Sequence, residues 1–360
     1  MHHNYLSELS KILPISYSRW VAKFRKENLI DTLKSPNNVK THLLSTLYFI
    51  PDGRNKGLGG KLFKLFDKYL QRNKIKFDII HAQYTWPQGY VAVKLGQKYN
   101  TPVVITLHEP QIDLRRNASN SRFQCVWRKA NALIRVNQTD IPLLREFNKK
   151  VYYIPNGFNP AKIPRISRSK TRGLLIKDPK ITNKKIVLNV ANLVPVKGHK
   201  YLIEAMKIVL NKRKDVICYI GGEGPLKKKL EDQIKKLNLQ EHVKLLGFIP
   251  DEELYLWMNA ADIFVLPSLS EGNPTVMFEA LGVGLPFVGT AVGGVPEIIT
   301  SEDYGLLCKP GDAEDLAEKI LIALEKEWDR EKIRKYAEQF TWDNIAKQVV
   351  RVYEEVLNEH

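Results

Sequence analysis

Short apolar runs alternate with longer amphipathic segments through the second half of the chain. Residues 184–193 (KKIVLNVANL) concentrate apolar and β-branched side chains, which predicts a strand, whereas residues 199–213 repeat apolar positions every three to four residues, which predicts a helix. The alternation continues to about residue 308. Parallel strands need crossover connections, which helices commonly supply. Residues 184–340 are therefore predicted to form a doubly wound α/β domain of the Rossmann-like type.

The first half of the chain carries the same pattern with less regularity. Strand patterns occupy residues 77–83, 101–108, 130–137 and 150–157, with helical patterns at 87–100 and 139–150. Residues 1–160 are therefore predicted to form a second Rossmann-like domain. Nothing in residues 1–50 has the pattern of an opening strand followed by a glycine-rich loop, so this domain is predicted to be incomplete.

Two further segments complete the predicted organisation. Residues 161–183 are rich in Pro, Lys, Arg and Ser without clear periodicity, which is typical of a linker between domains. Residues 341–360 have the spacing of one more amphipathic helix. We expect this helix to pack back on the N-terminal domain.

Charge is distributed unevenly along the chain. The formal net charge is +17, and the excess of Lys and Arg lies in the first half, whereas the second half is slightly acidic. A basic domain suggests an anionic partner such as nucleic acid, an anionic membrane leaflet or a phosphorylated lipid; the alternative is a solvated, lysine-rich surface. No aromatic-basic platform accompanies the charge, so nucleic acid is not expected.

The N-terminal sequence and the cysteines bear on the compartment. The first residues lack the basic-then-apolar pattern of a secretory signal, and no apolar stretch approaches the roughly 18–20 residues that cross a bilayer. The chain's three cysteines stand far apart, as in proteins of a reducing compartment. The prediction is a cytoplasmic protein whose basic N-terminal half, including residues 19–26 and 61–66, is a candidate for peripheral contact with the inner face of the membrane.

Two loops that follow predicted strands contain candidate ligand-binding residues. Lys197 and Gly198 lie between a strand and a helix, where backbone N–H groups and the positive helix end favour anions. Gly222, Glu223 and Gly224 follow the next strand, where glycines let backbone approach a ligand closely. The alternatives are a solvated lysine and a turn that simply needs positive φ.

The most specific pattern is a pair of glutamates, Glu271 and Glu279, eight positions apart. The first lies in a loop after an apolar strand, and the second lies inside the following helix. A spacing of just over two turns, at about 3.6 residues per turn, allows both carboxylates to face one cleft. Four residues between them lie where free N–H groups of a helix start can receive a ligand: Gly272, Asn273, Pro274 and Thr275. The alternative is that the glutamates are ordinary surface acids.

Taken in order, these pieces resemble the donor domain of the retaining glycosyltransferases of family 4. The matching pieces are Lys197–Gly198, Gly222–Pro225, Leu245–Phe248, Ala261–Ser268, the Glu271-x7-Glu279 motif, Gly293–Glu297 and Phe340–Trp342. Weaker matches follow in the first half at Asp78–Ala82, Thr106–His108 and Pro155–Gly157. The resemblance implies a GT-B fold, in which two Rossmann-like domains face a cleft.

The resemblance also implies roles for three catalytic candidates. Glu271 would bind hydroxyls of the donor sugar and stabilise the developing oxocarbenium charge, and Lys197 would neutralise the diphosphate leaving group with help from N–H groups near Asn273 and Thr275. His108 would reach from the N-terminal domain toward the donor sugar. A positive clamp of this kind stabilises a departing nucleoside diphosphate without a metal ion.

The remaining implied roles concern donor binding. Glu279 would bind the ribose, and Phe248 would frame the base. The other expected donor-binding positions are Asn192, Gly198, Gly222, Glu223, Gly224, Gly272, Asn273, Pro274 and Thr275.

Three positions depart from the family pattern. Asn192 stands where the family usually has an arginine, His108 is followed by Glu109 and Pro110 where small residues are common, and the opening strand with its glycine-rich loop has no counterpart in residues 1–50. These departures keep an alternative open, in which a catalytically impaired protein binds a nucleotide-sugar or partners without turnover.

The prediction from the sequence is a retaining glycosyltransferase. It would transfer a sugar from a UDP- or GDP-sugar, as substrate, to a glycan or lipid-linked acceptor. No cofactor is expected, and no metal ion is expected because no Asp-x-Asp motif flanks the site.

Overall fold

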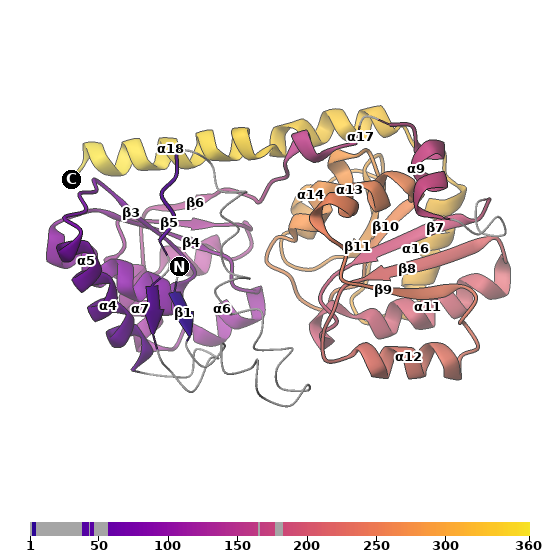
Figure 1. Ribbon diagram of the computed structural model, residues 1–360, viewed down its shortest axis with the longest axis horizontal. Helices are drawn as coiled ribbons and strands as arrows, with labels where there is room; N and C mark the ends of the chain where they lie inside the picture. Colours follow the sequence, from indigo (N-terminus) through magenta and orange to yellow (C-terminus); the bar gives the residue numbers. More distant parts are fainter. Residues whose placement is uncertain (1, 5–37, 43, 47–56, 165, 177–182) are drawn as a thin grey trace.

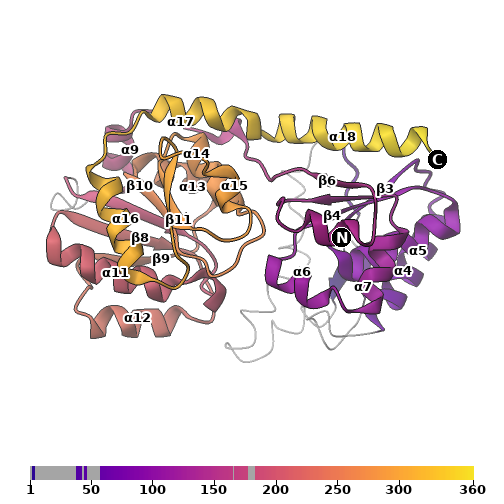
Figure 2. The ribbon, with the colours of Figure 1, turned by 180° about the vertical axis from the view of Figure 1, so that it is seen from behind.

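The computed structural model describes residues 2–4, 38–42, 44–46, 57–164, 166–176 and 183–360. Two α/β domains lie side by side, and a long C-terminal helix, α18 (Trp342–Asn358), runs from the second domain back over the first (Figures 1 and 2). Both sheets are parallel with interleaved helices. The predicted pair of Rossmann-like domains is confirmed.

The C-terminal domain is built on a six-stranded parallel sheet in the order β12-β11-β10-β7-β8-β9. Read from the opposite edge, this is the 3-2-1-4-5-6 order of doubly wound nucleotide-binding sheets. Its strands are β7 (Lys185–Val190), β8 (Val216–Gly221), β9 (Val243–Gly247), β10 (Ile263–Leu266), β11 (Phe287–Thr290) and β12 (Gly305–Cys308).

Helices cover both faces of this sheet because apolar side chains alternate along its strands. On β7, Ile186 and Leu188 join the core on one face of the sheet, whereas Val187 joins the core on the other face. The helices of the domain are α11 (His199–Lys212), α12 (Lys227–Lys236), α13 (Asp251–Ala260), α14 (Thr275–Gly282), α15 (Val295–Ile298), α16 (Ala313–Glu325) and α17 (Arg330–Ala337).

The N-terminal domain has a four-stranded parallel sheet in the order β3-β4-β5-β6. The strands are β3 (Ile80–Gln83), β4 (Val103–Leu107), β5 (Ala132–Arg135) and β6 (Val151–Tyr153). The helices are α4 (Leu58–Arg72), α5 (Tyr90–Tyr99), α6 (Gln111–Asn117), α7 (Ser121–Lys129) and α8 (Ile141–Arg145). A separate parallel pair is formed by β1 (His2–Asn4) and β2 (Leu44–Thr46). The predicted lack of an opening strand and glycine-rich loop falls mainly on residues 5–37 and 47–56, outside the described residues.

Helix α18 covers one face of the N-terminal sheet. Its apolar residues Ile345 and Val352 pack with Val104 and Ile134 of β4 and β5, while the other face of the sheet packs against α5 and α7. The last element of the chain therefore belongs to the core of the first domain, and it links the two domains covalently for a second time.

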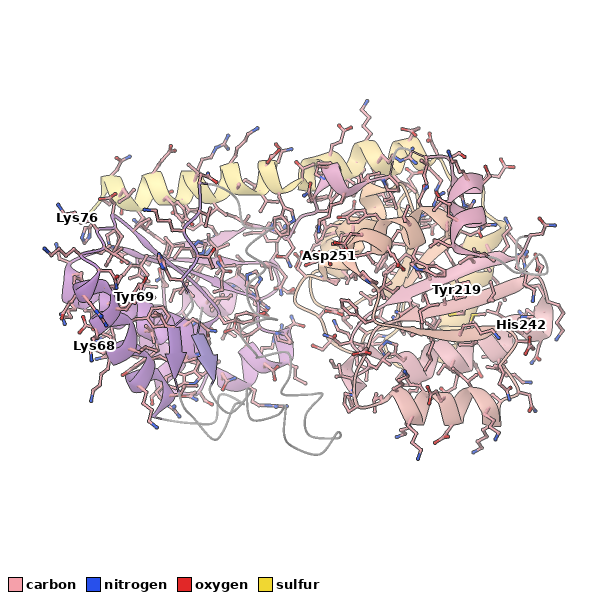
Figure 3. All side chains as sticks on the ribbon, in the orientation of Figure 1. Lys68, Tyr69, Lys76, Tyr219, His242 and Asp251 are labelled. Atoms are coloured by element: carbon pink, nitrogen blue, oxygen red, sulfur yellow. The ribbon has the colours of Figure 1, made fainter. Side chains whose placement is uncertain are left out.

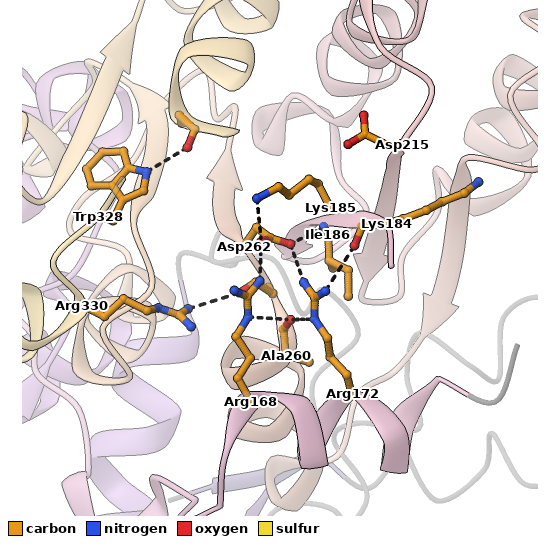
Figure 4. A network of polar contacts seen from close by, with 12 residues as sticks. Arg168, Arg172, Lys184, Lys185, Ile186, Asp215, Ala260, Asp262, Trp328 and Arg330 are labelled. Carbon is orange, nitrogen blue, oxygen red and sulfur yellow. Dashed lines mark hydrogen bonds and ion pairs between the residues drawn. The ribbon is translucent and has the colours of Figure 1, made fainter. Parts of the chain in front are cut away.

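The segment predicted as a linker, residues 161–183, contains an ordered helix, α9 (Arg168–Leu175). Its arginines dock it onto the C-terminal domain (Figure 4): Arg172 pairs with Asp262 at 2.5 Å, and Arg168 pairs with the other oxygen of the same carboxylate. Burial raises the pKa of Asp262, but the charges of Arg168 and Arg172 outweigh burial and hold it below its ordinary value. The basic residues that made this segment resemble a linker are the ones that dock it.

No helix among the described residues is both long enough and apolar enough to cross a bilayer.

Candidate functional site

The candidate site lies at the carboxyl ends of the strands, where β7 and β10 are neighbours. In a sheet of this order, the connections after these two strands leave in opposite directions and open a crevice between them. Lys197 follows β7 and Glu271 follows β10, and Lys197 Nζ lies 2.6 Å from Glu271 Oε1. Ser268 donates a hydrogen bond to the same oxygen at 2.6 Å. Sheet topology therefore brings together two charged residues that are 74 positions apart.

A cavity of about 540 Å³ opens above this ion pair, between the domains. Both domains and α18 line it, with Gln83, Tyr84, His108, Pro110, Val136, Asn156, Lys197, Glu271, Gly272, Asn273, Thr275 and Trp342. The three residues predicted as catalytic, Glu271, His108 and Lys197, are among them. The cavity is not lined by the other predicted donor-binding residues: Asn192, Gly198, Gly222, Glu223, Gly224, Phe248, Pro274 and Glu279.

Contacts between the domains frame the cavity. The side-chain amide of Asn156 donates to Asn273 O at 2.5 Å, and the backbone N–H of Asn156 donates to Asn273 Oδ1 at 3.0 Å. A Cβ on Gly272 would lie 3.3 Å from His108 O, so glycine permits the close approach of the two domains here. Glu297 of α15 accepts hydrogen bonds from the backbone N–H groups of Gln138 and Thr139. The cavity walls are therefore held in a closed arrangement.

The glycines of the strand-end loops pack against the protein itself. Gly198 has φ +67°, and a Cβ there would lie 1.9 Å from Pro267 O. Gly222 and Gly224 have φ +136° and +159°, and a Cβ on either would meet a backbone oxygen of the loop after β7. The need for positive φ accounts for glycine at these positions, and the close approach of their backbone to a ligand stays a prediction. Glu223 between them is exposed.

His108 is a neutral histidine held by a glutamine. Burial, and then the charge of Arg135, lower the pKa of His108 to about 4. Its Nε2 lies 2.6 Å from Gln83 Oε1, and because an amide oxygen only accepts, Nε2 carries the proton. The chain of contacts continues from the Gln83 amide to His81 at 3.4 Å and from His81 Nδ1 to the Tyr353 hydroxyl at 2.5 Å. Helix α18 therefore supports the orientation of His108 from behind.

Glu279 lies apart from the ion pair, on the inner part of α14. Burial, and then the charge of Asp251, raise its pKa to about 7, while Lys162 opposes them. No hydrogen bond from the described residues contributes to this pKa. Asp251, at the start of α13, lies on the side of the C-terminal domain that faces the other domain (Figure 3). Glu271 lines the cavity and Glu279 does not, and the sharing of one cleft by the two carboxylates stays a prediction.

Comparison with known proteins gives the family. The model of the glycosyl transferases group 1 matches residues 174–340, and that of Glycosyltransferase Family 4 matches residues 32–162. An uncharacterised glycosyltransferase of Methanocaldococcus jannaschii, MJ1178, is 30% identical over 294 residues, which cover 78% of this chain and 76% of that protein. The chain belongs to the family 4 glycosyltransferases.

Two solved structures show the fold of this glycosyltransferase. Sucrose-phosphate synthase from Thermosynechococcus elongatus has a TM-score of 0.74 at 23% identity, covering 91% of this chain and 87% of that one. The Anabaena protein HepE, solved in complex with UDP-glucose, has a TM-score of 0.70 at 23% identity, covering 87% of this chain and 86% of that one. The chain thus has the GT-B fold that the sequence predicted.

Several cavity residues of this glycosyltransferase were not predicted from its sequence. Gln83 is the last residue of β3, Tyr84 follows it, and Asn156 follows β6, so each occupies the same kind of strand-end position as Lys197 and Glu271. That position was the available signal. Trp342, the first residue of α18, had a signal only in the Phe340–Trp342 match, which assigned it no role at the site.

Proposed function

We propose that this glycosyltransferase moves a sugar from a nucleoside diphosphate donor to a glycan or lipid-linked acceptor, with retention of anomeric configuration and without an obligatory metal ion. The observation that carries the proposal is the Lys197–Glu271 pair at the junction of β7 and β10, open to a cavity that the N-terminal domain closes. Departure of a nucleoside diphosphate creates negative charge, and a fixed cation at that point stabilises it.

The diphosphate would lie between Lys197 and the start of α14. Thr275, the first residue of this helix, lines the cavity, and the helix N-terminus contributes partial positive charge. Pro274 has no N–H, so the donors there come from Asn273 and Thr275. Glu271, held by Ser268 and Lys197, would face the sugar and stabilise positive charge at its anomeric carbon.

The nucleoside would extend toward α13 and β9. Glu279 would accept hydrogen bonds from the ribose hydroxyls, which would supply the partners that its half-buried carboxylate lacks. Phe248, just after β9, is 69% exposed and would stack on the base. The UDP-glucose complex of HepE makes UDP-sugars the first donors to test.

A basic face on α4 supports peripheral membrane contact of the N-terminal domain. Lys61, Lys64, Lys68 and Arg72 are exposed at spacings of three or four residues, and Lys68 lies at the outer edge of this domain (Figure 3). Such a face attracts anionic lipids, at about 1 kcal/mol per basic residue near the surface. The other basic segment, residues 19–26, lies outside the described residues. Co-sedimentation with phosphatidylserine vesicles, reduced when Lys61, Lys64 and Lys68 are changed to Gln, would support this contact; equal binding would refute it.

The test of the proposed function is a donor screen with UDP-, GDP- and ADP-sugars, measuring Kd by calorimetry and release of nucleoside diphosphate with and without EDTA. The expected result is one preferred donor, with release that Lys197→Met lowers about 10²-fold and that EDTA leaves unchanged. Lys207→Met is the matched control, because Lys207 is an exposed lysine on α11, the helix that begins just after Lys197. Product NMR would establish the anomeric configuration. Binding without release, even with lipid extract supplied, would refute the enzyme and favour the catalytically impaired alternative.

A further inference from the structure

Tyr84 combines an exposed ring with a strained backbone at the wall of the cavity. It follows β3 directly, lines the cavity and is 44% exposed. Its backbone has φ 68° and ψ 153°, close to a region that is populated essentially by glycine. A tyrosine remains in such a conformation only where the surrounding structure enforces it, and strain of this kind concentrates at ligand-binding sites.

The surrounding structure does enforce this conformation. The backbone N–H of Tyr84 donates to Thr106 O at 2.8 Å, and its carbonyl accepts from Gly89 N–H at 3.0 Å. The next backbone N–H, that of Thr85, donates to Glu109 Oε1 at 2.6 Å. The second carboxylate oxygen of Glu109 is buried and has no partner among the described residues. A buried carboxylate oxygen without a hydrogen-bond partner lowers the stability of the protein. We therefore expect the contact of Glu109 with Thr85 to serve a function.

The ring itself is not part of the core of the domain. Tyr84 belongs to none of the apolar core clusters of the described residues. Its ring centroid lies 5.4 Å from that of His108, at an interplanar angle of 55°. The ring is thus placed beside His108, on the wall that the N-terminal domain contributes, while Lys197 and Glu271 lie on the wall of the C-terminal domain.

The position of the Tyr84 ring indicates which ligand group it would contact. If the donor's diphosphate lies against Lys197, the opposite wall faces the group that receives the sugar. An aromatic face carries partial negative charge and attracts polarised C–H groups as well as cations. A pyranose ring has a face of such C–H groups, with hydroxyls at its rim that polar neighbours such as Gln83 can bind.

We propose that Tyr84 is the stacking platform of the acceptor subsite, that the acceptor unit there is a pyranose, and that Glu109 is a positioning residue that holds this platform. This inference rests on the proposed function. It also gives a role to Glu109, one of the positions at which this chain departs from its family.

The test distinguishes the effect of the Tyr84 side chain from the effect of its strained backbone. With UDP bound, saturation-transfer NMR would measure binding of the methyl α- and β-pyranosides of glucose, galactose and mannose, and the same sugars would be assayed as acceptors with the preferred donor. Tyr84→Ala is expected to raise the acceptor KM about tenfold, which corresponds to about 1.4 kcal/mol, while donor KM stays within about twofold. Tyr84→Phe is expected to behave like the wild type.

Tyr84→Gly gives the sharper comparison, because glycine removes the ring and also relieves the backbone. It is expected to lose acceptor affinity as Tyr84→Ala does, but to melt at a higher temperature than Tyr84→Ala. Lys74→Gly is the matched control. Lys74 also has positive φ, at 50°, and is exposed after α4, so its replacement should leave acceptor KM unchanged.

Glu109 is tested through the same readout. Glu109→Ala is expected to raise acceptor KM without changing donor KM, and Glu109→Gln, which keeps an oxygen for Thr85 N–H, is expected to restore most of the loss. A purely structural role would instead lower stability and change both KM values together.

Three outcomes would overturn the inference: an unchanged acceptor KM in Tyr84→Ala, a change confined to donor KM, or no response of the UDP-bound wild type to any pyranoside. If wild-type UDP release still depends on Lys197 in the last case, the proposed function stands and only the pyranose platform fails. If no nucleotide-sugar binds at all, both fail.

Discussion

Replacement of Glu279 by glutamine should stabilise the free protein at neutral pH while weakening donor binding. The pKa of Glu279 is raised from 4.5 to about 7, first by burial and then by Asp251. The folded protein therefore holds this proton more tightly than the unfolded chain. As pH rises above 4.5, the unfolded chain ionises first, so the free energy of unfolding falls until about pH 7 and stays lowered above it. Glutamine has no proton to lose and should remove this dependence.

The size of the effect follows from the two pKa values. Full linkage gives a penalty of about 1 kcal/mol at pH 5 and about 3 kcal/mol at pH 8. Solvent reaches part of this half-buried carboxylate and screens its charge. We therefore expect the advantage of Glu279→Gln over the wild type to grow by about 2 kcal/mol between pH 5 and pH 8.

Urea unfolding of both proteins at pH 5 and pH 8 measures this change in stability. Calorimetry with UDP measures the loss of donor affinity. Loss of the charged acceptor for the ribose hydroxyls should weaken UDP at least about tenfold at pH 8. Glu231→Gln, the same substitution at an exposed position on α12, is the matched control and should change stability by under about 0.5 kcal/mol at either pH. A stability difference equal at the two pH values would refute the assigned burial of this carboxylate, and unchanged UDP affinity would refute its contact with the ribose.

Three other substitutions test the rest of the site. Lys197→Met should lower kcat/KM about 10²-fold, because it removes the charge that stabilises the leaving group; a loss under about threefold in steady-state assays would contradict that role. Gly272→Ala should lower kcat about tenfold with UDP affinity within twofold, since the new methyl group would crowd His108 O across the domain interface; unchanged kcat would show that this closed approach is not required. Glu297→Ala should speed amide hydrogen exchange at Thr139 at least about tenfold by removing its acceptor, whereas equal exchange would show that the interdomain contact is absent in solution.

Much of the architecture could be predicted because its signals are local. On β7 the alternation of Ile186, Val187 and Leu188 shows that both faces of a strand are buried, and the spacing in residues 199–213 shows one buried face of a helix. Strand and helix alternation then requires parallel strands. In such a sheet all carboxyl ends share one edge, so Lys197 and Glu271 could be predicted to meet although they are distant in sequence.

The linker shows where this reasoning fails. Arg168 and Arg172 were interpreted as part of an aperiodic basic segment, and nothing in their spacing indicates that Asp262 pairs with both. An ion pair between positions so far apart depends on how the short helix α9 packs against the C-terminal domain. The composition of the segment does not indicate that packing.

The sequence alone therefore determined the family, the fold of each domain and the candidate residues of the donor site, because these follow from the periodicity of single elements and from motifs at strand ends. Only the tertiary structure showed that Gln83, Tyr84 and Asn156 join His108 on the opposite wall. Gln83 and Tyr84 reach the cavity because the domains close on each other, and Tyr353 supports His81 because the last helix returns to the first sheet. Contacts of this kind depend on the packing of whole elements, and no local pattern of polar and apolar positions specifies them.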